Sequence, residues 1–406
     1  MIMKQIFLKA WLGMAICLAT FSCGITELGG VEKDETDGVW NSPVMDTPAL
    51  DQRITFVSAF DYPEGYDWHS DPERGERKCS LVVLRDGVPS LKIPVGDKYN
   101  VSPDPDMHRI VNGHLYTDFS TSSETIIKKD GKPLFSYQKP EMICDFKVYD
   151  DQVHTLGHSR SGGGFSYRVN GAVVLERSNG YTFERIMVQD TIVSIAFVEP
   201  IASADGVIER YYVMIGGKVA QVALRNDIRK VWDVAVINGE TYYLASLVGL
   251  SAPVLVSDNG LTALSVPSSV SLVSCRMIVM DNGICVEGIL SNGKNVESIL
   301  WNQDFSYQRF PKGMTFSALS YSNDVVHCAI NPTVGGGVGL IYRGDESHAM
   351  PMDYACMSRD AIDFSSGILS VGLSSLTGDK PVLWVDGQLK TVDVNGFISS
   401  VESESL

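Results

Sequence analysis

A tight turn recurs along the chain at nearly constant spacing, and this repeat limits the possible folds more than any other feature. Each turn follows a short apolar segment, as at residues 84–87 and 169–171. Asp-Gly and Asn-Gly suit two-residue hairpins because both central positions need a positive φ. Measured between their last residues, the turns are 44, 40, 46, 43, 44, 40 and 43 residues apart. These last residues are Gly87, Gly131, Gly171, Gly217, Gly260, Asp304, Gly344 and Gly387.

The segments between the turns repeat as well. Residues 181–188, 191–198, 211–215 and 218–224 have the pattern of four consecutive strands, and the same order begins again at Met314. One small sheet cannot cover both of its own faces, so such units need a neighbour on each side. The sequence therefore predicts an all-β fold, a single β-propeller of eight blades with four antiparallel strands each. Seven blades is the alternative, if one of the first two units is degenerate.

The first unit lacks its innermost strand. Residues 54–60, 81–84 and 88–93 supply the second, third and fourth strands, and the missing strand is expected at the other end of the chain, over 395–401. Asn395-Gly396-Phe397 matches the start of the strand at 179–181. We expect strands from both termini to close the ring, because closure removes open sheet edges.

The amino terminus has the pattern of an export signal. Lys4 and Lys9 precede an uncharged run over 10–21. Those twelve residues would rise only about 18 Å as a helix, too little for a bilayer core of roughly 30 Å. The pattern predicts a signal peptide over 1–22. Breaker-rich, acidic residues follow, so we expect a flexible tether over 23–50 and the propeller domain over 51–406.

The end of the apolar run reads Thr-Phe-Ser-Cys-Gly, with the cysteine at Cys23. This segment resembles a bacterial lipoprotein box, which implies that Cys23 carries the lipid. An ordinary signal peptide with an incidental cysteine is the alternative, and Cys17 is a second candidate for the lipidated residue.

With these export and lipidation signals, the chain resembles the β-propeller lipoproteins common in Bacteroides-like bacteria. The resemblance rests on strand-turn-strand segments such as Pro-Val-Leu-Trp-Val-Asp-Gly at 381–387, and it spans roughly residues 50 to 406. It implies an outer-membrane lipoprotein, facing the periplasm or the cell surface, attached to the membrane through its lipid only. Most such proteins lack an assigned activity.

Charge and cysteine content restrict the partners. The chain has 33 basic and 49 acidic residues, a formal net charge of −16, which disfavours nucleic acid as a partner. We expect a monomer. Six cysteines lie beyond the export segment and are expected to be buried free thiols, with Cys275 and Cys285 the pair most suited to a disulfide if one forms.

Connections between the second and third strands, and between units, are long and variable, and a propeller places both kinds on one face. The longest, residues 61–78, combines aromatic rings with carboxylates, which suit the C–H face and the hydroxyl groups of a sugar. A self-packed surface loop is the alternative. The predicted ligand-binding residues are Tyr62, Tyr66, Asp67, Trp68 and Asp71.

Motifs of common enzymes are missing from the sequence: it contains no His-Glu-x-x-His, no Gly-x-Ser-x-Gly and no Rossmann glycine pattern. We therefore predict no catalytic residue, no metal site and no cofactor. The favoured function is a lipid-anchored extracytoplasmic binding protein that recognises a glycan or a protein partner through the variable face. The alternatives are a polysaccharide hydrolase or lyase with carboxylates near the central channel, and an envelope assembly scaffold.

Overall fold

The predicted turns fold the chain back on itself. Asp86, Asn170 and Asp386 have φ angles of 50°, 48° and 42°, and a glycine with positive φ follows each of them. Their side chains also accept a backbone N–H from the second strand of the same unit, as Asp86 Oδ1 does from Thr55 N at 2.8 Å. Asp and Asn therefore serve these turns twice, by tolerating the left-handed conformation and by fastening the turn to the sheet.

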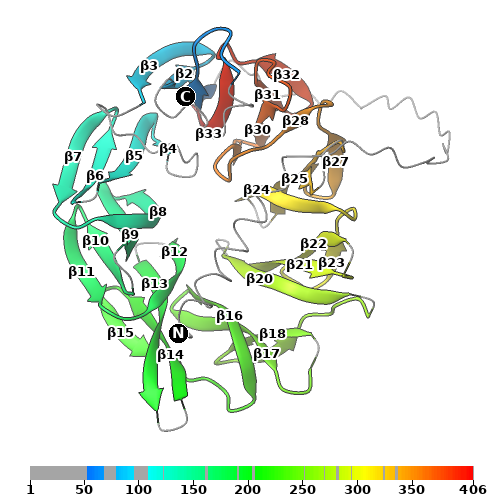
Figure 1. The fold of residues 1–406 in the computed structure, drawn as a ribbon. Helices are drawn as coiled ribbons and strands as arrows, with labels where there is room; N and C mark the ends of the chain where they lie inside the picture. Colours follow the sequence, from blue (N-terminus) through cyan, green and yellow to red (C-terminus); the bar gives the residue numbers. More distant parts are fainter. Residues whose placement is uncertain are drawn as a thin grey trace.

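The computed structural model joins these hairpins into eight antiparallel sheets arranged as a ring, so the all-β, eight-bladed prediction is confirmed (Figure 1). It describes residues 53–67, 79–95, 108–121, 123–160, 163–189, 192–203, 206–250, 252–268, 270–279, 283–293, 295–322, 325–333 and 337–405. The segments predicted to be a signal peptide and a tether, with Cys23 between them, lie outside this range. Within it, no helix is long and apolar enough to cross a membrane.

Each blade runs outward from an inner strand at the centre of the ring. From inner to outer strand, blade 1 has β33 (Gly396–Ser405), β1 (Arg53–Asp61), β2 (Ser80–Arg85) and β3 (Val88–Pro94); blade 2 has β4 (His108–Val111), β5 (His114–Ser120), β6 (Thr125–Lys129) and β7 (Lys132–Tyr137); blade 3 has β8 (Glu141–Tyr149), β9 (Gln152–Ser159), β10 (Phe165–Val169) and β11 (Ala172–Arg177); blade 4 has β12 (Tyr181–Gln189), β13 (Ile192–Ser203), β14 (Gly206–Ile215) and β15 (Lys218–Gln221).

Blade 8 departs from the regular pattern, because two short strands, β28 and β29, pair in succession with β30. Blade 5 has β16 (Ile228–Ile237), β17 (Glu240–Leu247), β18 (Pro253–Ser257) and β19 (Gly260–Ala263); blade 6 has β20 (Ser271–Val279), β21 (Ile284–Ser291), β22 (Val296–Trp301) and β23 (Tyr307–Arg309); blade 7 has β24 (Met314–Ser322), β25 (Val325–Pro332), β26 (Leu340–Arg343) and β27 (Glu346–Ala349); blade 8 has β28 (Tyr354–Ala355), β29 (Ile362–Ser365), β30 (Ile368–Ser375), β31 (Val382–Val385) and β32 (Gln388–Thr391).

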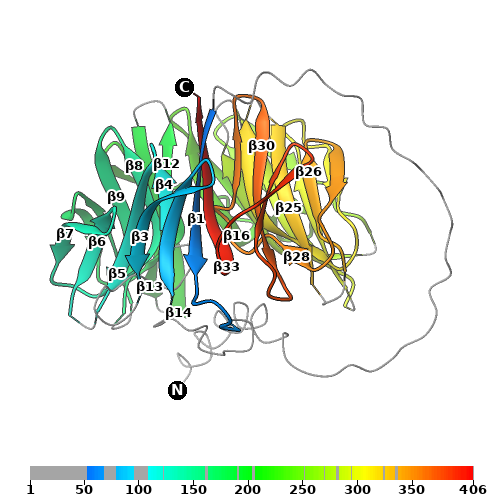
Figure 2. The same cartoon turned by 90° about the horizontal axis from the view of Figure 1, so that it is seen from above.

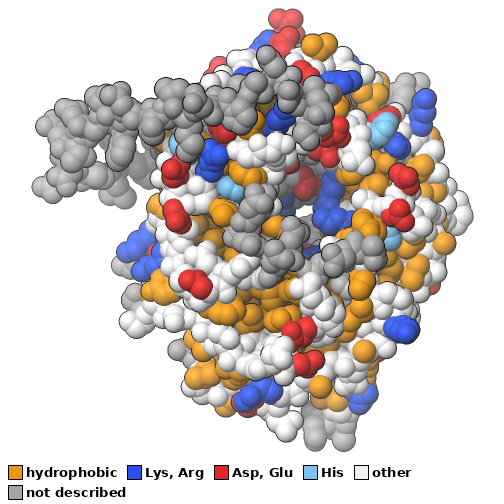
Figure 3. Space-filling model, turned by 180° about the vertical axis from the view of Figure 1, so that it is seen from behind, with side chains coloured by type: hydrophobic (Ala, Val, Ile, Leu, Met, Phe, Trp, Pro, Cys, Tyr) orange, Lys and Arg blue, Asp and Glu red, His pale blue; other side chains and the backbone are white. Residues whose placement is uncertain are grey.

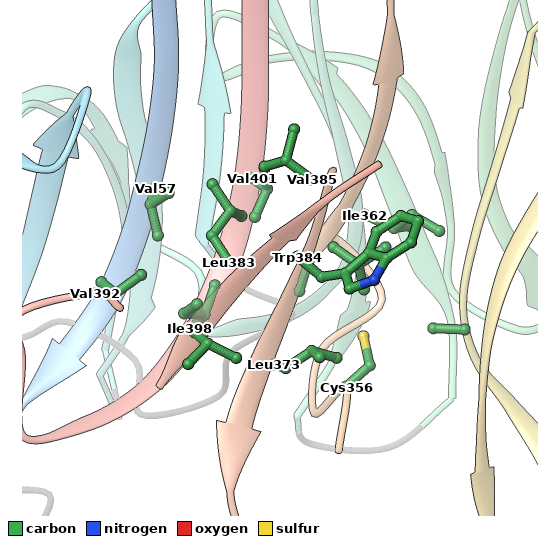
Figure 4. Close-up of a cluster of buried hydrophobic side chains, with 14 of the residues drawn as sticks. Val57, Cys356, Ile362, Leu373, Leu383, Trp384, Val385, Val392, Ile398 and Val401 are labelled. Carbon is green, nitrogen blue, oxygen red and sulfur yellow. The ribbon is translucent and has the colours of Figure 1, made fainter. Parts of the chain in front are cut away.

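The two ends of the described chain meet in blade 1, which confirms the predicted closure. Strand β33 pairs antiparallel with β1, placing Val57 opposite Val401 and Phe60 opposite Phe397. Phe60 and Phe397 pack with Leu81 and Leu115 in a core between blades 1 and 2. Val57 and Val401 join an apolar core between blades 8 and 1 that includes Trp384, Leu373 and Ile398 (Figure 4). We call this contact between the two blades the seam.

The ring has two faces (Figure 2). The hairpin turns between first and second strands, and between third and fourth strands, lie on one side, the turn face. The connections between second and third strands, and between blades, lie on the other, the loop face. The connection over 199–209 differs from the other long connections, because most of it forms a hairpin: β13 extends to Ser203 and β14 begins at Gly206.

Inner strands carry a β-bulge at an equivalent level in several blades. Cys144, Ser317 and Ser399 are each the extra residue of such a bulge. Each donates its side-chain hydrogen to a carbonyl oxygen of the neighbouring second strand, at 3.3, 2.9 and 3.2 Å respectively. A bulge bends its strand and increases its twist, so this repeated device shapes the inner wall of the ring.

Candidate functional site

The predicted ligand-binding loop is only partly at the surface. Tyr62 is 4% exposed and packs in the core near Phe397, with ring centroids 6.4 Å apart. Tyr66 is half-buried and stacks on Tyr62 at 5.6 Å, whereas Asp67 is exposed. Tyr62 therefore contributes packing beneath the surface, and Tyr66 and Asp67 form the accessible part. Trp68 and Asp71 lie outside the described residues, and their roles stay predictions.

Hydrogen bonds hold the start of this loop against the segment that leads into β33. Tyr62 N donates to Asn395 O at 2.8 Å, and Asn395 Nδ2 donates to Pro63 O at 2.7 Å. Gly396 permits this approach, because a Cβ atom there would lie 2.1 Å from Phe60 O. The loop is thus positioned by the same contacts that close the ring.

A hollow of about 420 Å³ opens between this loop and blade 8 on the loop face. Tyr66 and Asp67 form one wall, and the connection between β30 and β31 forms the other. That connection is held in place by Ser375 Oγ, which accepts the backbone N–H groups of Thr377 and Asp379 at 3.1 and 3.0 Å. The hollow therefore combines a ring edge, an apolar side chain and several oxygen acceptors. Its lining residues are Gly65, Tyr66, Asp67, Leu376, Thr377, Gly378 and Asn395.

A second group of polar residues lies on the inner wall. Arg109 of β4 reaches Asp145 of β8 at 2.9 Å and Asp360, just before β29, at 3.2 Å. The other oxygen of Asp145 accepts Ile186 N of β12 at 2.7 Å. Burial alone would lower the pKa of Arg109, but the two carboxylates outweigh burial and raise it. These contacts connect blades 8, 2, 3 and 4.

The same arrangement occurs again two blades further on. Arg185 of β12 donates to Asp233 Oδ1 of β16 at 2.8 Å, and the other oxygen of Asp233 accepts Met277 N of β20 at 2.7 Å. We call Arg109–Asp145 and Arg185–Asp233 the inner-wall ion pairs. Lys or Arg and Asp or Glu side chains lie close together near the centre of the ring (Figure 3).

The inner-wall carboxylates are held in structural roles. General acid catalysis of glycoside cleavage needs one carboxylic acid that can give up a proton and a second carboxylate nearby. Asp145 and Asp233 each bind an arginine and a backbone N–H instead, so both oxygens of each carboxylate are engaged in contacts between blades. This geometry does not support acid–base work by these two residues.

Buried histidines and cysteines complete the set of reactive side chains. His154 and His327 occupy equivalent positions in β9 and β25, and burial lowers the pKa of both. All six cysteines beyond the export segment are free, and Cys275 and Cys285 are not cross-strand partners. Among the described residues, no group of three or more His, Cys, Asp or Glu side chains is placed to hold a metal ion.

Sequence reasoning did not identify the inner-wall ion pairs. The signal was present, since Asp145 and Asp233 each interrupt an apolar strand pattern, between Cys144 and Phe146 and between Trp232 and Val234. An acidic residue inside a buried strand needs a partner. The arginine that acts as this partner comes from another blade. Strand patterns carry no information about which residues of different blades lie close together.

Comparisons with known proteins find similarity at the level of solved structures only. No protein-family model matches the chain, and no curated protein matches it. Dihydro-heme d1 dehydrogenase NirN aligns over 86% of this chain and 75% of its own, with 10% identity and a TM-score of 0.49. Hsv2 of Kluyveromyces lactis aligns over 78% and 92%, with 7% identity and a TM-score of 0.38. The lectin SapL1, in complex with alpha methyl fucoside, aligns over 64% and 97%, with 10% identity and a TM-score of 0.33. No functional argument rests on likenesses of this size.

Proposed function

We propose that this protein is a lipid-anchored extracytoplasmic binding protein that recognises a glycan or a protein partner through its loop face. The observation that carries the proposal is the hollow beside Tyr66 and Asp67. Its volume of about 420 Å³ falls in the range of small-molecule sites. An aromatic edge next to oxygen acceptors suits a sugar residue, so a glycan is the favoured ligand.

The path of the chain supports this orientation. Strand β1 runs from the turn face to the loop face, and its first residue, Arg53, pairs with Ser405 near the carboxy terminus (Figure 2). The segment before Arg53 therefore joins the ring on the turn face. A membrane tether attached there would leave the loop face directed toward partners.

Binding is favoured over the alternative of polysaccharide cleavage. Glycoside cleavage by acid–base catalysis needs two carboxyl groups that are free to act together, and the inner-wall carboxylates Asp145 and Asp233 are occupied by ion pairs. For an assembly scaffold, the described residues offer no specific supporting observation.

The binding proposal is tested by screening the protein on a glycan array and measuring any hit by calorimetry. Stacking on an aromatic ring contributes on the order of 1 kcal/mol. We expect Tyr66→Ala and Asp67→Asn each to weaken binding about fivefold or more. Tyr307→Ala is the matched control, because that tyrosine is 42% exposed on the outer strand β23. Equal affinity in all variants would remove the hollow as the site.

The anchor is tested separately. Cys23→Ala should release the protein from membranes, and mass spectrometry of the wild-type amino terminus should detect a lipid on Cys23. Cys17→Ala is the control and should leave membrane association unchanged. Membrane association that survives Cys23→Ala would contradict the proposed lipid anchor at Cys23. It would leave the proposal of a binding site on the loop face unchanged.

A further inference from the structure

Glu184 has an unusual backbone conformation for a residue inside a strand. It lies in the middle of β12, the inner strand of blade 4, with φ of +54°. The other non-glycine residues with positive φ in the described part of the chain all lie between strands. A side chain with a Cβ atom adopts this conformation at a cost in free energy, and such residues gather at functional sites.

An enlarged bulge produces this conformation. In β12 the pairing goes from Thr182–Phe197 directly to Ile186–Ile195, so three residues, 183–185, stand opposite Ala196. The equivalent bulges in blades 3 and 7 contain one extra residue each, Cys144 and Ser317. The bulge of β12 therefore has two extra residues, one more than the bulges of blades 3 and 7, and Glu184 is the central residue of 183–185.

Both neighbours of Glu184 are fixed. Phe183 stacks on Tyr211 with ring centroids 6.3 Å apart, and Arg185 is bound to Asp233 at 2.8 Å. Glu184 N itself donates to Thr182 Oγ1 at 3.2 Å. The bulge is thus a defined structure that presents one side chain, and it is not a loose segment of strand.

The carboxylate of Glu184 has no partner among the described residues. Glu184 is exposed, and its carboxylate makes no hydrogen bond and no ion pair with any described residue. The nearby donors are already engaged: Arg185 binds Asp233, and the Thr182 hydroxyl lies 3.2 Å from His158 Nε2. Burial lowers the pKa of His158, and the negative charge of Glu184 opposes this shift.

We propose that Glu184 binds an organic cation, an ammonium or guanidinium group of a ligand, on the inner wall of the ring. A site that offers an acceptor and no free donor suits a ligand group that only donates. A hard metal ion requires several oxygens, more than this single carboxylate supplies. Met142, the cross-strand partner of His158, is 52% exposed and provides apolar surface for the stem of such a ligand. The net charge of −16 favours the approach of cations. This site is distinct from the hollow at blades 8 and 1.

The test uses spermidine as the probe, in isothermal titration calorimetry at low and physiological salt. Glu184→Gln should weaken binding at least tenfold. Asp258→Asn is the control, since Asp258 is an exposed carboxylate in the turn between β18 and β19. We expect it to stay within twofold of the wild type. Equal affinities in the three proteins would overturn the proposal in favour of diffuse attraction by the acidic surface, and so would the absence of binding to the wild type at millimolar spermidine.

Glu184→Gly provides a second readout. Glycine adopts a positive φ at little cost, so this variant should melt at a temperature at least as high as the wild type while losing spermidine binding. A lower melting temperature with retained binding would show that Glu184 has a structural role only. Glycan binding at the hollow should be unchanged by either substitution, which separates this site from the proposed function.

Discussion

The seam between blades 8 and 1 and the inner wall of blades 2 to 6 hold the same ring together by different forces. At the seam, apolar side chains such as Trp384 and Ile398 interlock, and Gly372 lies so close that a Cβ atom there would be 2.5 Å from Ile398 Cγ2. On the inner wall, buried aspartates bind an arginine of the preceding blade and a backbone N–H of the following one.

This difference separates two requirements of a closed ring. The seam must join residues from both ends of the chain, and apolar contact tolerates that because it is not directional. The inner wall must set the relation between neighbouring blades, and hydrogen bonds with defined partners do this more specifically. The two regions should therefore respond differently to truncation, to loss of a single charge and to pH.

The largest expected effect comes from removing β33 by truncation after Val394. Phe397 and Ile398 are 2% and 0% exposed, and burial of each contributes about 1.5–3 kcal/mol. The edge of β1 would also lose its partner. We expect the free energy of unfolding to fall by more than about 5 kcal/mol, comparable with the whole stability of many domains. Thermal unfolding followed by circular dichroism measures this.

Deletion of Leu406 alone is the control for that truncation and should leave the melting temperature unchanged. A protein that lacks β33 and still melts like the wild type would contradict closure by both termini. It would also show that the seam is not needed for stability.

An intermediate effect is expected from Asp233→Ala on the inner wall. Asp233 is 3% exposed, and its removal leaves Met277 N without its acceptor and Arg185 with two carbonyl oxygens but no carboxylate to balance its charge. Breaking a buried pair in this way costs about 3–5 kcal/mol. Chemical denaturation measures the loss. Asp227→Ala is the matched control, because its partner Arg225 is exposed and ion pairs at the surface contribute little to stability. Similar losses in both variants would show that the inner-wall ion pairs have no special role.

The smallest expected effect is a loss of stability in mild acid that involves an apolar contact. His327 of β25 stacks on Phe364 of β29 at 4.0 Å, and neither ring nitrogen has a hydrogen-bond partner among the described residues. Burial, with a smaller contribution from the charge of Arg343, lowers its pKa to about 4. The folded protein therefore binds this proton less readily than the unfolded chain does.

It follows that the contribution of His327 is complete above about pH 6.5 and is lost as the pH falls toward 4. The loss is about 2 to 3 kcal/mol. Unfolding free energies of the wild type and of His327→Phe at pH 7, 5.5 and 4 measure it. The variant should have a shallower pH dependence, and identical slopes would assign the acid sensitivity to other groups.

The blade count, the turn positions and the closing strand could all be predicted from the sequence, because each depends on local chemistry. A two-residue turn needs positive φ at Asp86 and Gly87 whatever lies elsewhere, and the match of residues 395–397 to the strand start at 179–181 indicates a strand even without its partner. One such turn is weak evidence for a fold, but eight of them at nearly constant spacing predict a propeller. The interior of the loop at 61–67 could not be predicted in this way, since burial of Tyr62 depends on Phe397.

What only the tertiary structure decided is which distant groups meet. Leu376 and Tyr66 line one hollow because the ring brings blade 8 beside blade 1. Arg185 meets Asp233 because the ring places β12 beside β16, and the neighbouring residue Glu184 has a carboxylate with no partner among the described residues. The physical reason is the distance over which each kind of interaction acts. Turn and strand preferences act over a few residues along the chain, whereas ion pairs and hollows depend on distances in space that exist only after the ring has closed.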